Sequence, residues 1–174
     1  MSNMLTTLLS YQAWANGAFF DKLETMDQRR HETEFHQAIR LMNHSHVVAR
    51  IFAAHLVGVR HTYRTDNTEE TPELADLRAA VAASDQWYGG YVRDVTPAQL
   101  AEQIAFSFTD GDKGYMSREE MITHVVLHGG YHRGEVGRIL TQLAIETPWD
   151  TFAVFLHRDQ PSRRQQGKLE LALS

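Results

Sequence analysis

The sequence predicts an all-α protein, an up-down-down-up-type four-helix bundle with a short β-hairpin or extended segment before the last long helix. Two observations lead to this prediction. Four long segments repeat apolar residues at spacings of three and four, which is the period of an amphipathic helix. One short stretch between the third and fourth segments instead alternates apolar and smaller residues, as a strand does.

The first two helices are expected over residues 3–25 and from about 36 to 57. Asn3 is a plausible cap for the first helix, and Gly58 is a stop signal for the second. The second helix carries one stripe that mixes apolar residues with histidines: Leu41, His44, Val48, Ile51, Phe52 and His55.

A third helix is expected over residues 74–95, where Thr96-Pro97 ends it. A short hairpin follows between 104 and 116, with its turn at Asp110-Gly111-Asp112-Lys113-Gly114. Ser117 and Glu120 have the spacing of a capping box, which opens a long fourth helix that continues to Leu143.

The length of 174 residues fits one domain, which we place at 1–157. The remainder, 158–174, is expected to be a polar C-terminal tail, and its first part, Arg158 to Lys168, can be mobile.

Charge and composition exclude several classes of function. The net charge of −5 offers no basic surface for a phosphate backbone, so we expect no nucleic-acid partner. Neither a signal peptide nor a membrane span is apparent, so we expect a cytoplasmic protein without membrane contact. The absence of cysteine excludes disulfides, thiolate nucleophiles and cysteine-based metal sites.

Ten histidines make histidine the residue type to consider for chemistry. His124, His128 and His132 are four apart and therefore share one face of the fourth helix. Either neighbouring pair can place two imidazole nitrogens on one metal ion, and the spacing does not choose between the pairs. A third ligand should come from another helix. There His44 has apolar neighbours on its face, whereas His46 lies about 200° around the helix.

Other metal chemistries do not match the sequence. The segment from His128 to His132 lacks the Glu that follows the first His in HExxH proteases, and the paired Glu-x-x-His motifs of di-iron bundles are absent. One divalent ion with three neutral nitrogen ligands retains an open coordination position, which is typical of a catalytic site.

Three parts of the sequence carry a family resemblance: Tyr11-Gln-Ala-Trp-Ala-Asn16, Leu41-Met-Asn-His44, and His128-Gly-Gly-Tyr-His-Arg-Gly-Glu135. Together they resemble the DinB family of the DinB/YfiT-like superfamily. The resemblance implies a four-helix bundle in which His44, His128 and His132 bind nickel or zinc, with iron or manganese as further options, commonly in a homodimer. The chain departs from the family pattern at Phe52, where many relatives have Trp, and at Glu135, where Gln is frequent.

Three residues beside the triad have open roles. We expect His124 to lie beside the ligands or in the core. Arg133 and Glu135 either orient ligands and substrate or belong to an exposed face of helical salt bridges. The catalytic group itself is unknown, because a metal-bound water or a metal-bound thiol would both serve.

The similarity to thiol-dependent members of the superfamily implies a metal-dependent transferase or isomerase that uses a small-molecule substrate and a low-molecular-weight thiol. A metal-dependent hydrolase is the enzyme alternative. An alternative from a different class of function is a non-catalytic stress-response dimer that binds a metal ion or a small ligand.

Overall fold

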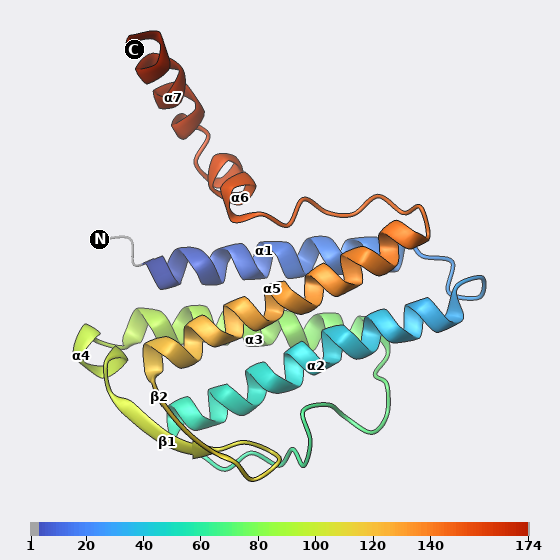
Figure 1. Cartoon of the computed structure of the whole chain (residues 1–174), viewed down its shortest axis with the longest axis vertical. Coiled ribbons are helices and arrows are strands. Elements are labelled where there is room, and N and C mark those ends of the chain that lie inside the picture. The colour runs from blue at the N-terminus through green and yellow to red at the C-terminus, as the bar shows by residue number, and fades with distance from the viewer. Residues whose placement is uncertain (1–3, 174) are drawn as a thin grey trace.

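Four long helices dominate the structure, a computed structural model that describes residues 4–173, with side chains as far as residue 170 (Figure 1). They are α1 (Met4–Glu24), α2 (Glu32–Val57), α3 (Leu74–Asp94) and α5 (Arg118–Gln142). The shorter elements are α4 (Pro97–Leu100), strands β1 (Gln103–Ser107) and β2 (Lys113–Ser117), and the C-terminal helices α6 (Phe152–Asp159) and α7 (Ser162–Leu173). The described chain is therefore mostly helical, with one small antiparallel sheet.

The long helices lie side by side. Helix α2 packs mainly against α5 and α1 mainly against α3, while α1 also touches α5 and α2 touches α3. In Figure 1, α1 and α5 run in one direction and α2 and α3 run in the opposite direction. The long connection between α2 and α3 is what allows these two consecutive helices to run parallel.

The structure confirms the helix boundary signals that lie within the described residues. Gly58 ends α2 with a φ of 70°, a left-handed conformation that glycine adopts without a steric penalty. Both hydrogen bonds of the capping box between Ser117 and Glu120 are present at the start of α5. Helix α2 begins earlier than expected, at Glu32, where two acidic residues in its first turn favour a helix N-terminus. Asn3 lies outside the described residues.

The hairpin of β1 and β2 closes one end of the helices. Phe106 pairs across the hairpin with Gly114, and its ring lies against Phe52 of α2 at a centroid distance of 5.6 Å. A Cβ at Gly114 would stand 2.3 Å from the Phe106 ring, so only glycine leaves room for that ring. This packing fixes the hairpin over α2.

The apolar core is divided into two clusters. One surrounds Phe52, Tyr88 and Val125 near the hairpin, and the other surrounds Phe20 and Val136 near the opposite end. Buried polar side chains occupy the level between them: Gln12, Asn16, Asn43, Ser84 and Arg133. The molecule thus has a polar layer across the middle of its helices.

The C-terminal segment is helical. Phe155 of α6 is buried against the rings of Tyr11 and Trp14 on α1. The expected polar tail instead contains helix α7, whose side chains are exposed from 162 to 170 and which projects from the long helices (Figure 1). None of the helices in the described part of the chain is both long and apolar enough to span a membrane.

Candidate metal centre

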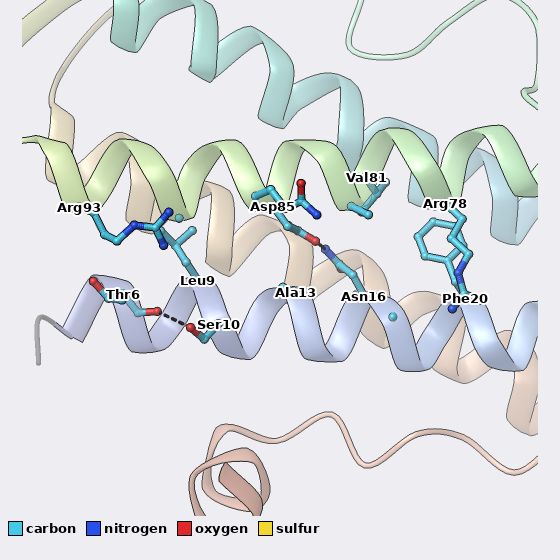
Figure 2. Close-up of a pocket in the computed structure, with 14 residues that line it drawn as sticks. Thr6, Leu9, Ser10, Ala13, Asn16, Phe20, Arg78, Val81, Asp85 and Arg93 are labelled. Atoms are coloured by element: carbon cyan, nitrogen blue, oxygen red, sulfur yellow. Dashed lines mark hydrogen bonds between the residues drawn. The ribbon is translucent and has the colours of Figure 1, made fainter. Parts of the chain in front are cut away.

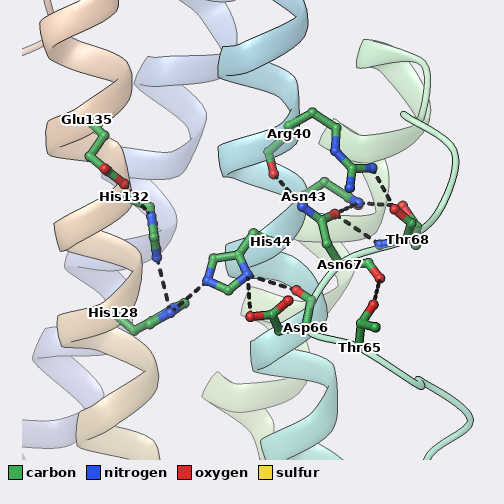
Figure 3. A network of polar contacts seen from close by, with 10 residues as sticks. All are labelled: Arg40, Asn43, His44, Thr65, Asp66, Asn67, Thr68, His128, His132 and Glu135. Atoms are coloured by element: carbon green, nitrogen blue, oxygen red, sulfur yellow. Dashed lines mark hydrogen bonds and ion pairs between the residues drawn. The ribbon is translucent and has the colours of Figure 1, made fainter. Parts of the chain in front are cut away.

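Three histidine side chains from two helices converge in the polar layer (Figure 3). The Nε2 atom of His128 lies 3.1 Å from Nε2 of His44 and 3.2 Å from Nε2 of His132. One ligand atom from each residue lies within 4.8 Å of the others, and within the described residues this is the group of His, Asp and Glu that can hold a metal ion. The structure therefore brings together the three residues that the sequence pointed to.

The helices determine which histidines meet. His128 and His132 are one turn apart on α5, and α2 is the helix packed most extensively against that face. His44 projects from α2 toward them. His46 points elsewhere, because its Nδ1 lies 3.4 Å from the Ser84 hydroxyl on α3. The histidine of α2 that faces His128 and His132 is thus His44.

Hydrogen bonds fix the outer two rings of the triad. Nδ1 of His44 lies 2.8 Å from the carbonyl oxygen of Asp66, and Nδ1 of His132 lies 2.6 Å from a carboxylate oxygen of Glu135. Both oxygens are acceptors, so each Nδ1 carries the proton that it donates. The Nε2 atoms of His44 and His132 are left with free lone pairs that face His128.

Burial favours the neutral form of the two histidines on α5. The pKa of His128 is lowered to about 3, mainly by burial and then by the neighbouring His132 and His44. Burial also lowers the pKa of His132, although Glu135 opposes the shift. Without an ion, a proton on Nε2 of His128 can be donated to the Nε2 atoms of His44 and His132. A metal ion in place of that proton could be bound by all three Nε2 atoms.

Two of the three nitrogen–nitrogen separations fit a divalent ion. A tetrahedral zinc ion with bonds of ~2.0 to 2.1 Å places its nitrogen ligands about 3.3 Å apart. The observed separations of 3.1 and 3.2 Å are close to this value. Imidazole suits zinc, nickel, copper and iron, so the donor set fits the expected nickel, zinc and iron, whereas manganese prefers oxygen ligands.

A comparison with known proteins identifies the family. The family model described as the DinB family matches residues 1–166. The chain belongs to the DinB family. Protein DinB of Bacillus subtilis (strain 168) is 22% identical to it over 166 residues, which cover 90% of this chain and 95% of that protein. The resemblance inferred from the sequence motifs is confirmed.

In this DinB-family chain the loop between α2 and α3 is fastened to α2 just before His44. The Asn43 side chain, 3% exposed, donates to the side chains of Asn67 and Thr68 (Figure 3). Arg40 donates to the carbonyl oxygen of Thr68 and accepts at its own carbonyl from Asn67. These bonds hold the loop where the Asp66 carbonyl reaches His44.

Sequence reasoning missed this role of the loop. Asp66 belongs to a polar run without periodicity, and such a run does not indicate which of its carbonyl groups faces a neighbouring helix. Asn43, a polar residue directly before His44 on a helix with an apolar stripe, was the one available signal.

The three residues considered beside the triad have different positions. His124 lies one turn from His128, and its ring contacts Phe52 at a centroid distance of 4.8 Å. Glu135 contacts His132 and orients it, which is one of the two roles expected for this residue. The expectation of an exposed salt-bridge face is wrong for Arg133, whose side chain is 1% exposed.

Arg133 is the centre of a buried polar network. Its guanidinium donates to Asp150 at 2.8 Å and to the Asn16 side-chain oxygen at 3.0 Å. Asn16 in turn donates to Asp85 at 2.9 Å, and the Gln12 amide donates to the other Asp85 oxygen at 3.2 Å. The network joins α1, α3, α5 and the segment before α6.

A second hollow lies between α1 and α3, with a volume of about 600 Å³ (Figure 2). Two of its three charged side chains already have partners: Asp85 accepts from two amides, and Arg78 is paired with Asp21 and Glu24. The histidine cluster is therefore the better candidate for chemistry.

Replacing Asp85 by Asn should stabilise the protein at neutral pH. Burial raises the pKa of Asp85, although hydrogen bonds from Asn16 and Gln12 oppose the shift. The folded chain therefore favours the neutral carboxyl group, and its stability contribution is present below the ordinary pKa of 3.8 and lost as pH rises through the raised value. Asn stays neutral, and rotation of the Gln12 amide would turn its unpartnered Oε1 toward it.

Urea unfolding of wild type and Asp85→Asn between pH 4 and 7.5 measures this effect. The advantage of the variant should be largest at pH 7.5 and shrink toward pH 4. Asp94→Asn, an exposed control on the same helix, should change stability by less than ~0.5 kcal/mol at every pH. A variant less stable than wild type at pH 7.5 would contradict the prediction.

Proposed function

We propose that this chain is a metal-dependent enzyme built on an up-down-down-up four-helix bundle, with one divalent ion held by His44, His128 and His132. The observation that supports the proposal is the convergence of three Nε2 atoms while hydrogen bonds fix the rings of His44 and His132. Three ligands leave an open coordination position, as in catalytic rather than structural sites.

Nickel or zinc is the proposed ion, with iron or manganese as alternatives. Bound there, the ion supplies Lewis acidity, which lowers the pKa of a thiol or water molecule that it binds. The chain's own contribution is positioning. The Asp66 carbonyl and Glu135 orient two ligands, and Glu135 is 36% exposed, so its carboxylate can also exchange a proton with solvent.

The proposed reaction is transfer or isomerisation with a low-molecular-weight thiol and a small-molecule substrate. The absence of cysteine supports it, because a bound thiol supplies the sulfur nucleophile that the chain lacks. A hydrolase would use water at the same position.

We also propose a homodimer. Leu127 and Tyr131 lie on consecutive turns of α5, and each is 68% exposed. Adjacent large apolar side chains in solvent are typical of surfaces that a partner covers.

Metal content tests the proposed centre. Protein purified without an affinity tag and dialysed against zinc or nickel should hold about one ion per chain by mass spectrometry, because three ligands converge on one point. His44→Ala, His128→Ala and His132→Ala should each lose it. His124→Ala, the matched control one turn along α5, should retain it. A metal-free wild type would show that the histidines are core residues, and the enzyme proposal would fall with them.

Removing Glu135 should weaken the ion's binding without abolishing it. The carboxylate fixes the His132 tautomer, and loss of such a partner lowers metal affinity by about 10- to 100-fold. Competition with a chromophoric chelator would measure the affinity of Glu135→Ala. Glu119→Ala, exposed in the first turn of α5, should bind like wild type. Equal affinity in both variants would mean that the contact does not orient the ligand.

Turnover of electrophiles in the presence of a panel of thiols tests the reaction class. His44→Ala should abolish activity while leaving the far-UV helical signal unchanged, because the ligand and not the helix is removed. Turnover without thiol would favour the hydrolase. Activity that survives the loss of His44 would exclude the metal mechanism, and a loaded protein inactive throughout the panel would favour a non-catalytic binder.

A further inference from the structure

A hollow of about 720 Å³ is lined by the end of α2, the loop that follows it, and residues 104–109 of the hairpin. This volume is within the range of small-molecule sites. A smaller pocket of about 300 Å³ adjoins His44 and His128. The two share four lining residues, which are His55, Phe106, Phe108 and Thr109. The larger hollow therefore lies beside the pocket that borders the proposed metal centre.

The fixed charge of the larger hollow is positive. Among its lining residues, all within the described part of the chain, Arg60 and Arg64 carry a full charge at pH 7 and none is Asp or Glu. We call it the arginine hollow. Asp66 and Asp110 line the smaller pocket instead, and a divalent ion held by the triad would offset their negative charge. The metal centre thus adds to the attraction of the arginine hollow for an anion.

Both arginines are available to a ligand. Their side chains are exposed, and no described residue forms an ion pair or a hydrogen bond with either guanidinium group. A guanidinium group presents several N–H donors in a plane and binds the oxygens of a carboxylate, sulfonate or phosphate with two parallel hydrogen bonds. Arg60 and Arg64 therefore favour an oxyanion as the ligand group.

Two imidazole nitrogens of the arginine hollow are buried without a partner among the described residues. They are Nε2 of His55 and Nδ1 of His61, whose rings meet edge to face at a centroid distance of 5.3 Å. Buried polar atoms in folded proteins are nearly always hydrogen-bonded, so these two nitrogens indicate a polar partner from outside the chain. An oxyanion can accept from either ring when that nitrogen carries the proton.

The hairpin side of the hollow is apolar. Phe106 and Phe108 meet edge to face at a centroid distance of 4.9 Å, and both line the hollow. Phe106 is buried, whereas Phe108 is 45% exposed, so its ring has a free surface. An apolar group attached to the oxyanion would find a contact there.

We propose that the arginine hollow binds a small molecule that joins an oxyanion to an apolar group. Arg60 and Arg64 bind the oxyanion, and Phe108 contacts the apolar group, which lies on the side of the hollow shared with the smaller pocket. The inference deepens the proposed function by naming the class of substrate. It rests on that function for the reaction, whereas binding itself needs only the hollow.

Phenylmethanesulfonate is a suitable probe, because it joins an aromatic ring to an oxyanion that is a weak metal ligand. Benzyl methyl sulfone has the same ring and a similar shape without the charge. Both are titrated into metal-free and zinc-loaded protein at low ionic strength, with binding measured by calorimetry and by saturation-transfer NMR. The sulfonate should bind at least about tenfold more tightly than the sulfone in both forms of the protein.

Variants locate the binding. Arg60→Gln and Arg64→Gln should each weaken binding of the sulfonate about threefold or more and leave binding of the sulfone unchanged. Neither exposed side chain has a partner in the described part of the chain, so both variants should fold. Arg30→Gln makes the same change of charge at an exposed position just before the opposite end of α2, and this matched control should bind like wild type.

Imidazole NMR signals of the zinc-loaded protein distinguish the hollow from the ion as the binding site. Addition of the sulfonate should shift the ring nitrogen signals of His55 and His61. Shifts confined to His44, His128 and His132 would show that the sulfonate binds the ion, and this result would overturn the proposal.

Equal binding of the sulfonate and the sulfone would also overturn it, as would sulfonate binding unchanged in both Arg60→Gln and Arg64→Gln. Metal content measured on the same samples separates the two hypotheses. A chain that prefers the sulfonate but binds no ion refutes the metal centre alone, and a chain that binds the ion without preferring the sulfonate refutes the ligand class alone.

Discussion

The buried guanidinium of Arg133 is the constraint on which the arrangement of the site depends. A charge that is 1% exposed must be paired, since an uncompensated buried charge costs several kcal/mol. Asp150 and the Asn16 oxygen pair it, and they come from the segment before α6 and from α1. These contacts fix the rotation of α5 about its axis. Because His132 is the preceding residue, about 100° around the helix, its side chain is directed toward α2. The ion pair between Arg133 and Asp150 on one side of α5 thus helps to position His128 and His132 on a different side of the same helix.

The polar layer is stable because apolar clusters on both sides of it hold the helices together. Packing of Phe52, Val125 and their neighbours on one side, and of Phe20, Val136 and theirs on the other, holds α2 and α5 together at two levels. Side chains between these levels need not supply the hydrophobic stabilisation themselves. They are free to be imidazole, amide and carboxylate groups, provided that each finds a partner. The histidines at this height are therefore positioned by the apolar packing on both sides of them.

Short sequence patterns predicted the structural features that depend only on residues close together in the chain. The capping box at Ser117, the left-handed stop at Gly58 and the four-residue spacing of His128 and His132 each depend on a few neighbouring residues. Helical phase allowed only one of His44 and His46 to face the other histidines, and the apolar neighbours of His44 favoured that residue. The burial of Arg133 could not be predicted in this way, because it depends on Asp150 and Asn16, which are distant in sequence. The role of Asp66 could not be predicted either, because the group that contacts His44 is a backbone carbonyl, which every residue possesses.

Asp66 also connects the two parts of the site. Its carbonyl oxygen accepts the proton of His44 Nδ1, and the residue also lines the pocket of about 300 Å³ that adjoins His44 and His128. Helices α2 and α5 carry the histidines and line one side of the pocket, whereas the loop before α3 and the hairpin before α5 line the rest. The loop that orients His44 is therefore also part of the pocket wall. A change in the position of this loop would alter both the orientation of His44 and the shape of the pocket.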